Sequence, residues 1–136
     1  MKITVESFVK AGIQEVWDAW NSPEDIVRWN AASDDWHTTR STVDLRVGGS
    51  FLSRMEAKDG SMGFDFEGTY TRIEPHRAIE YRMDDGREVR VDFVPRDDGV
   101  TVTTTFDAEP ENPAEMQRAG WQAISDNFAR YVEGRR

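Results

Sequence analysis

The N-terminal part of the chain changes from the hydrophobic pattern of a strand to that of helices. Apolar residues alternate with polar ones over residues 3–9, which predicts a β-strand. The apolar spacing then becomes that of a short amphipathic helix, with one stripe formed by Ile13, Val16, Trp17 and Trp20. A second helix is predicted to begin at Ser22 as its N-cap, with Pro23 in the first position, and to end at Asn30.

The central part, from Thr42 to Asp107, alternates in short runs separated by turn sequences. The turn signals are Gly48-Gly49, Lys58-Asp59-Gly60, Asp84-Asp85-Gly86 and Asp97-Asp98-Gly99. Because no helical pattern separates the runs, we predict an antiparallel meander with one buried face and one wet face. The first run is predicted to include Val43, Leu45 and Val47. In a later run one inward face is predicted to hold Phe64, Phe66, Gly68, Tyr70 and Arg72.

The last element is predicted to be a long helix. Asn112 is the expected N-cap, Pro113 the first helical residue and Glu115 the acid of a capping box. One stripe of this helix is apolar: Trp121, Ile124, Phe128, Tyr131 and Val132. An adjoining stripe holds Met116, Gly120, Ala123 and Asn127. The length of 136 residues, without a linker or repeat, predicts a single domain over residues 1–136.

Several stretches of sequence carry a family resemblance in addition to these patterns. They are Val16-Trp17-Asp18-Ala19-Trp20 with Ser22-Pro23-Glu24 and Arg28-Trp29, then residues 44–51, then residues 68–75, and finally Gly120-Trp121 with Phe128. In this order the chain resembles the START-like (SRPBCC, helix-grip) superfamily. Within it, the chain is similar to the branch of the C-terminal domain of the heat-shock-protein-90 ATPase activator (AHSA-type).

The resemblance implies an α+β helix-grip fold, in which a curved antiparallel sheet of about six or seven strands wraps around a long C-terminal helix. Two short helices would follow the first strand. A cavity between the sheet and the long helix binds small hydrophobic molecules in many relatives. Some relatives act as cyclases or hydrolases, polyketide cyclase-like enzymes among them, and the eukaryotic branch stimulates a chaperone ATPase.

Composition and charge narrow the classes of partner. The formal net charge of −9 predicts repulsion from nucleic acids and from anionic membrane surfaces. No stretch approaches the roughly 18 uncharged apolar residues of a membrane span. The N-terminal segment has the acidic Glu6 where a signal peptide needs an apolar run. Because cysteine is absent, disulfides and thiolate metal sites are excluded, and we expect a cytoplasmic protein.

Neither a metal nor a cofactor is expected. The two histidines lie far apart in the sequence, and neither is expected on a helix that would place a carboxylate beside it. No phosphate-binding glycine loop and no nucleophile elbow occurs. His76 is expected in a solvated turn. His37 is expected beside Trp36 in a loop before the sheet, near the mouth of the cavity, where Asp34 or Asp35 could orient it as a general base.

The candidate ligand-binding residues lie on faces predicted to point inward: Trp36, Ser53, Phe66, Gly68, Tyr70, Tyr81, Met116, Gly120 and Asn127. Ligand cavities combine mostly apolar walls with a few polar groups, which is the mixture found here. The structural alternative is that the tyrosines simply span from the core to the surface. Gly68 removes side-chain volume in mid-strand, and we expect the space above it to be ligand volume. On this hypothesis Gly68→Leu fills the cavity and costs little stability.

Three functions are consistent with these observations. The leading hypothesis is a binding protein that holds a small apolar or aromatic molecule in the cavity. The second is a cyclase-like or hydrolase-like enzyme that acts in the same cavity with a polar pair such as Tyr70 and His37. The third is an interaction protein that modulates a partner ATPase. A homodimer or a chaperone is left open as a partner, and no nucleic acid or membrane is expected.

Overall fold

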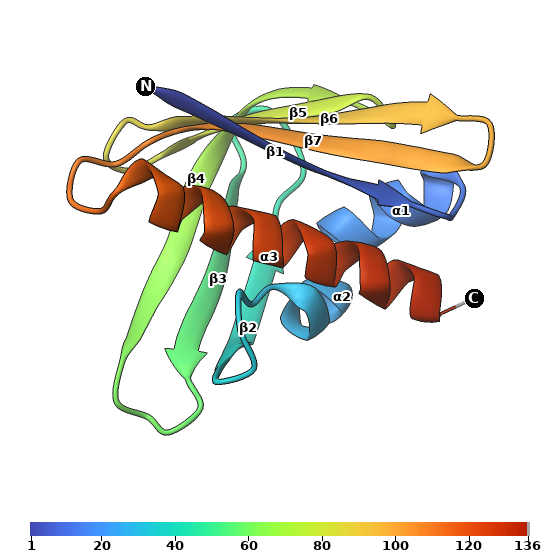
Figure 1. The fold of residues 1–136 in the computed structure, drawn as a ribbon. Helices are drawn as coiled ribbons and strands as arrows, with labels where there is room; N and C mark the ends of the chain where they lie inside the picture. The colour runs from blue at the N-terminus through green and yellow to red at the C-terminus, as the bar shows by residue number, and fades with distance from the viewer. Residues whose placement is uncertain (136) are drawn as a thin grey trace.

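The structure is a computed structural model and describes residues 1–135. Seven strands and three helices follow one another along the chain, as Figure 1 shows. In order they are β1 (Lys2–Val9), α1 (Ile13–Asn21), α2 (Pro23–Trp29), β2 (Trp36–Val43), β3 (Ser50–Ala57), β4 (Gly63–Glu74), β5 (Ala78–Met83), β6 (Glu88–Arg96), β7 (Gly99–Asp107) and α3 (Ala114–Gly134). The predicted α+β helix-grip architecture, with two short helices after the first strand, is therefore confirmed.

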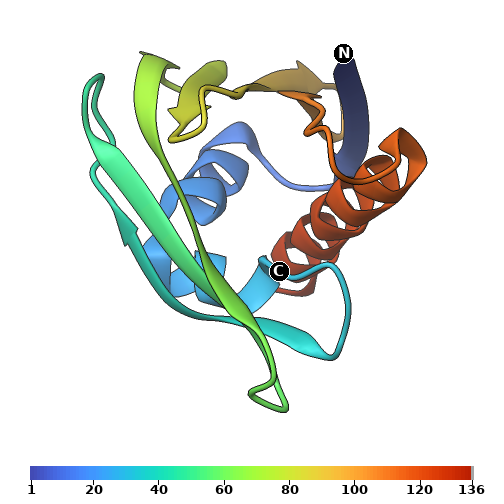
Figure 2. The same ribbon diagram turned by 90° about the vertical axis from the view of Figure 1, so that its left-hand side faces the viewer.

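All seven strands form one antiparallel sheet in the order β1-β7-β6-β5-β4-β3-β2. Every neighbour in the sheet is also a neighbour in sequence, except that β1 pairs with β7. Figure 2 shows the sheet curling around α3, with β2, β3 and β4 turned away from the plane of β1, β7 and β6. The concave face of this curled sheet therefore faces α1, α2 and α3.

Helix α3 lies along the edge strand β1 and satisfies part of its free backbone. Arg118 Nη1 donates to the carbonyl of Thr4 at 3.2 Å, and Gln122 Nε2 donates to the carbonyl of Glu6 at 2.8 Å. The hydroxyls of Ser7 and Ser125 are 2.7 Å apart. An exposed strand edge offers unpaired carbonyls to other chains, so these contacts both anchor the helix and close the edge.

The densest packing lies where the C-terminal half of α3 meets the two short helices. Phe128 is fully buried, and its ring meets the rings of Trp20 and Trp29 edge-on with centroids 4.9 Å apart in each case. Trp20 and Trp29 stack on each other, also at 4.9 Å, and Trp29 Nε1 donates to the carbonyl of Ala19 at 3.0 Å. These ring contacts and the Trp29 hydrogen bond hold α3 against the two short helices and form a buried corner of the molecule.

Two boundaries differ from the sequence-based expectation. Strand β2 begins at Trp36, and the chain leaves the sheet after Val43, so that Leu45 and Val47 lie in an exposed turn. That turn is tight, because a Cβ at Gly49 would lie 2.2 Å from the carbonyl oxygen of Asp44. At the other end of the chain, α3 begins at Ala114 with Pro113 as its N-cap residue and no side-chain cap. The predicted N-cap at Asn112 is therefore wrong by one residue.

The inward face of β4 also ends earlier than alternation predicts. The pairing with β5 shifts register between Tyr70 and Arg72, which is a β-bulge. The bulge turns Arg72 to the outer face, where its guanidinium pairs with Glu74 at 3.1 Å and with Glu80 at 3.7 Å. The prediction that Arg72 shares the inward face is therefore wrong.

Candidate functional site

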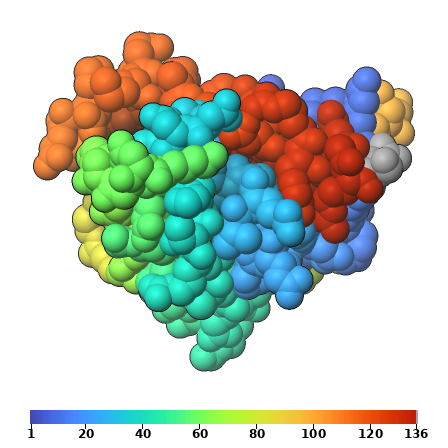
Figure 3. Space-filling view, turned by 90° about the horizontal axis from the view of Figure 1, so that it is seen from below, coloured from blue at the N-terminus to red at the C-terminus, as the bar shows by residue number. Residues whose placement is uncertain are grey.

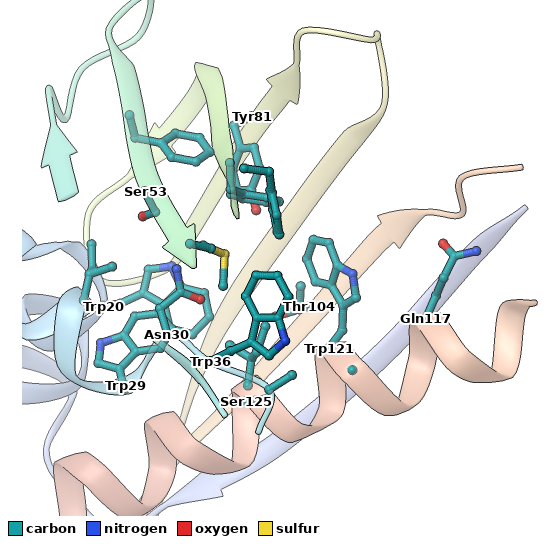
Figure 4. A pocket seen from close by; sticks show the side chains of 18 of the residues that line it. Trp20, Trp29, Asn30, Trp36, Ser53, Tyr81, Thr104, Gln117, Trp121 and Ser125 are labelled. Atoms are coloured by element: carbon teal, nitrogen blue, oxygen red, sulfur yellow. The ribbon is translucent and has the colours of Figure 1, made fainter. Parts of the chain in front are cut away.

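A cavity of about 520 Å³ lies between the sheet and the N-terminal half of α3. Its walls come from α1, α2, β2 to β5, β7 and α3. Figure 4 shows the side chains of Trp20, Trp36, Ser53, Tyr81, Thr104 and Trp121 around this common space. On the face drawn in Figure 3, the β3–β4 hairpin (green) and the segment after α2 (cyan) lie beside the start of α3 (orange to red). These segments contribute Trp36, Phe64 and Met116 to the rim.

Nine of the 26 residues that line the cavity in the described range 1–135 are aromatic. Trp121 of α3 stacks on Phe106 with ring centroids 4.0 Å apart and meets Phe66 edge-on at 6.1 Å. Phe51 contacts both Tyr70 and Tyr81, at 5.4 and 4.7 Å. At the rim the rings of Trp36 and Phe64 are 5.9 Å apart, and Phe64 is 47% exposed. Exposed aromatic residues at the rim of an apolar cavity are typical of a ligand entrance.

In the described part of the chain, six residues with hydroxyl groups interrupt the apolar wall, and two of them, Ser33 and Ser125, are hydrogen-bonded to other side chains of the protein. The other four are Ser53, Tyr70, Tyr81 and Thr104, all of which are buried residues. Within residues 1–135, no hydrogen bond joins any of these four side chains to another group of the protein. The four oxygen atoms are open to the cavity, since within residues 1–135 the only fully buried side-chain oxygen or nitrogen without a partner is Ser41 Oγ. Each of the four hydroxyls is therefore available to bond to a molecule in the cavity.

Burial keeps the two cavity tyrosines protonated. It raises the pKa of Tyr70 well above the usual value, and the negative charge of Asp44 raises that pKa further. Burial also raises the pKa of Tyr81, where the nearby positive charge of Arg87 partly opposes the shift. Both phenols are therefore hydrogen-bond donors over the whole physiological pH range.

Seven of the nine sequence-predicted residues line this cavity: Trp36, Ser53, Phe66, Tyr70, Tyr81, Met116 and Gly120. Their role in ligand binding stays a prediction. The structure also places side chains there that were not predicted to line it, notably Trp20, Trp29, Phe51, Arg87 and Trp121. The helical spacing of the tryptophans is equally typical of core residues. The sequence therefore predicts that they are buried but does not indicate that they line a cavity.

Gly68 does not line the cavity. Its cross-strand partner is Phe51, and a Cβ at position 68 would lie 3.0 Å from the Phe51 ring and 2.8 Å from the carbonyl oxygen of Arg82. The space above the glycine is therefore filled by Phe51 and is not ligand volume, contrary to the sequence-based expectation. Gly68 permits close packing between neighbouring strands.

Asn127 also lies outside the cavity. Its amide donates to the carbonyl of Ala31, and its side-chain oxygen accepts from Arg130. These contacts place it in a second, more polar hollow between α2, β2 and α3. The residues of α3 that line the cavity end at Ser125, and Asn127 lies beyond them, beside the buried corner. Its amide thus holds the segment after α2 against the helix.

His37 lines that second hollow too, while Tyr70 lines the cavity. Contrary to the expectation of a loop, His37 lies in β2, where it pairs in register with Glu56 of β3. Its neighbour Trp36 borders both the cavity and the second hollow, whereas His37 does not line the cavity. The structure therefore does not bring Tyr70 and His37 together as a catalytic pair.

Two further features of the described part of the chain bear on the classes of site. Within residues 1–135, no three His, Asp or Glu side chains come close enough together to hold a metal ion. No helix in the same range is both long and apolar enough to cross a membrane.

The fold and the cavity together define a helix-grip protein of the SRPBCC type. A profile of the family described as "Activator of Hsp90 ATPase homolog 1-like protein" matches residues 10–133, so the chain belongs to that family. No match was found among curated proteins.

Solved structures include close relatives. An AHSA1-like protein from Aeromonas hydrophila is 56% identical, with a TM-score of 0.93 over 99% of this chain and 94% of that one. A protein from Cytophaga hutchinsonii is 46% identical, with a TM-score of 0.85 over 98% and 93%. The Aha1 dimer from Colwellia psychrerythraea shares the fold at 13% identity, with a TM-score of 0.77 over 98% and 96%.

Proposed function

We propose that this protein binds a small apolar or aromatic molecule in the cavity between the sheet and α3. The observation that carries the proposal is the set of four hydroxyls, on Ser53, Tyr70, Tyr81 and Thr104, that line an apolar cavity and have no partner within residues 1–135. A volume of about 520 Å³ is in the range of small-molecule sites. Aromatic walls would hold the body of the ligand, and the hydroxyls would orient it.

The composition of the wall favours binding over catalysis. No Asp, Glu, His or Lys is among the residues that line the cavity in the described range 1–135. A hydrolase or cyclase usually needs a general acid or base whose pKa is near the working pH. The cavity tyrosines do not meet this need, because burial raises their pKa values. Reversible binding without turnover is the function that this wall supports best.

Gly120 offers the sharpest test, because it lines the cavity from α3 and a Cβ there would meet nothing within 4 Å. Gly120→Leu should fill the cavity and weaken binding of the neutral fluorescent probe N-phenyl-1-naphthylamine by about tenfold or more. The melting temperature should hold or rise, since leucine favours a helix over glycine by about 0.8 kcal/mol. Ala119→Leu is the matched control, because residue 119 is exposed on the same helix.

Equal probe binding by wild type and Gly120→Leu, with both folded, would contradict the proposal. If Gly120→Leu weakens probe binding as expected, mass spectrometry of small molecules that copurify with the wild-type protein would identify the natural ligand. Such a search belongs in the cytoplasmic fraction, which is where the absence of cysteine leads us to expect the protein.

A second candidate function rests on the family description. If the chain modulates the ATPase of an Hsp90-type chaperone, adding it to a purified bacterial chaperone should change the rate of ATP hydrolysis. The Colwellia relative is described as a dimer, so sedimentation analysis of this chain belongs with that experiment. An unchanged rate at saturating protein would leave ligand binding as the function to pursue.

A further inference from the structure

The cavity wall has an uneven distribution of charge. The chain carries 26 acidic and 17 basic residues. Among residues 1–135, however, Arg87 is the only charged side chain that lines the cavity. A lining arginine without a lining carboxylate gives the cavity a local positive charge, although the protein as a whole is acidic.

Arg87 lies in the turn between β5 and β6, at the end of the cavity near the start of α3. Its Nε donates to Asp85 at 2.7 Å, and within residues 1–135 no hydrogen bond uses its terminal Nη1 and Nη2 nitrogens. The Arg87 side chain is only 28% exposed, whereas Asp85 is 55% exposed. Water therefore screens the Asp85 carboxylate, and the guanidinium retains two donors for a second partner.

The groups around Arg87 could complete such a site. The hydroxyl of Tyr81 lies close enough for the Arg87 charge to lower the pKa of that phenol against the larger effect of burial. The amide of Gln117, another lining residue, is already used, because it bonds to Glu109 and Asn112 in the loop before α3. Arg87 and Tyr81, in contrast, have side-chain donors that no hydrogen bond uses within residues 1–135.

We propose that the ligand of the cavity is an amphipathic monoanion, such as an aromatic or aliphatic carboxylate, whose head group binds Arg87 and Tyr81 while its apolar body lies among the tryptophans. The proposal rests on the proposed function and specifies its ligand class. An arginine fork matches the two oxygens of a carboxylate, which makes the contact selective as well as strong.

Two other head groups fit the wall less well. A doubly charged phosphate would keep one negative charge without a partner, since the wall supplies a single cation. Aromatic walls also attract cations through the faces of their rings. A cationic ligand would nevertheless find no carboxylate among the lining residues in the described range, and Arg87 would repel it.

Displacement of N-phenyl-1-naphthylamine by two competitors of matched size tests the proposal. At neutral pH 1-naphthaleneacetate is an anion, whereas 1-naphthaleneacetamide is neutral. The wild-type protein should require about tenfold less acetate than amide for half-displacement, because the charge-assisted hydrogen bonds are made only with the anion. Arg87→Gln should abolish this preference, so that the two competitors displace the probe at similar concentrations.

Arg82→Gln is the matched control, because it removes the same charge from an exposed arginine in the neighbouring strand that does not line the cavity. It should leave the preference unchanged. Arg87→Lys should retain part of it, and it serves in place of Arg87→Gln if that variant does not fold.

The outcomes separate the two proposals. If the neutral probe does not bind the wild-type protein, the proposed function fails and this inference fails with it. If the probe binds but the wild-type protein prefers the amide or neither competitor, ligand binding stands and the anionic class is wrong. A preference for the acetate that persists in Arg87→Gln would likewise overturn the role of Arg87.

Discussion

The two halves of α3 perform different tasks along one continuous helix. In the C-terminal half, Ser125, Phe128, Ala129 and Val132 are buried against the sheet and the short helices. In the N-terminal half no residue is fully buried, and the inward side chains, Trp121 among them, line the cavity. One end of the helix is thus an anchor and the other is a wall. A hollow beside the second end is tolerated because the first end supplies the packing.

Phe128→Ala should produce the largest effect, because it removes a fully buried ring from the anchored half. We expect the free energy of unfolding, measured by urea titration, to fall by about 3–5 kcal/mol. Met116→Ala in the other half is the control, since Met116 is 61% exposed and its loss should cost less than about 0.5 kcal/mol. Similar losses for both variants would contradict the division of the helix.

Gly68→Leu should lower the free energy of unfolding by about 1–3 kcal/mol. The reason is overpacking, because a side chain at this position meets the Phe51 ring and the backbone of β5. Gly120→Leu adds the same side chain where there is space, and it should cost nothing. If Gly68→Leu were as stable as the wild-type protein, Phe51 would have to move, and the cavity would be more adaptable than its packing suggests.

Alkaline pH should destabilise the cavity half through its tyrosines. Burial raises the pKa of Tyr81 above that of an unfolded tyrosine, so the folded state keeps its proton when the unfolded state loses it. The stabilisation is complete below about pH 10 and declines above it. When the pH is raised from 8 to 11, the free energy of unfolding of Tyr81→Phe should therefore fall by about 1.4 kcal/mol less than that of the wild-type protein. Identical pH profiles would show that Tyr81 titrates normally.

At neutral pH, the hydroxyls of Tyr81 and Tyr131 should differ in their contribution to stability. Tyr131, in the anchored half, donates to Asp25 at 2.5 Å, whereas the Tyr81 hydroxyl has no partner within residues 1–135. Tyr131→Phe should cost about 1 kcal/mol, while Tyr81→Phe should be neutral or slightly stabilising. Thermal melts of the two variants make the comparison. A loss on Tyr81→Phe equal to that on Tyr131→Phe would mean that the cavity hydroxyl is already satisfied.

Most of the fold could be predicted from the sequence, because its signals are local. Alternating runs define β3 to β7, with Asp-Gly turns between all of them except β4 and β5, and apolar stripes define the helices. Strand β2 gives no such signal, since its middle residues, 37–42, are polar and it lies at the edge of the sheet. The β-bulge before Arg72 does not show in the alternation of residues along β4, so the sequence pattern could not locate it.

The site was less predictable, because it depends on contacts between distant segments. Inward register correctly selected Tyr70 and Tyr81, but it could not show that the Phe51 ring covers Gly68 from the next strand. The position of Arg87 in a turn gives no hint that its side chain reaches the cavity. Such information exists only once the curl of the sheet brings β3, the β5–β6 turn and α3 together.

The pairing of β1 with β7 has a consequence for how the chain folds. Lys2 and its partner Asp107 are 105 residues apart in sequence, and α3 must then dock on β1 from still farther along the chain. During synthesis, β1 therefore stays unpaired until β7 has been made. Closing so large a loop is slow compared with forming the hairpins between β2 and β7. We expect these hairpins to form the early folding nucleus, and the docking of β1 with α3 to be the late, rate-limiting event.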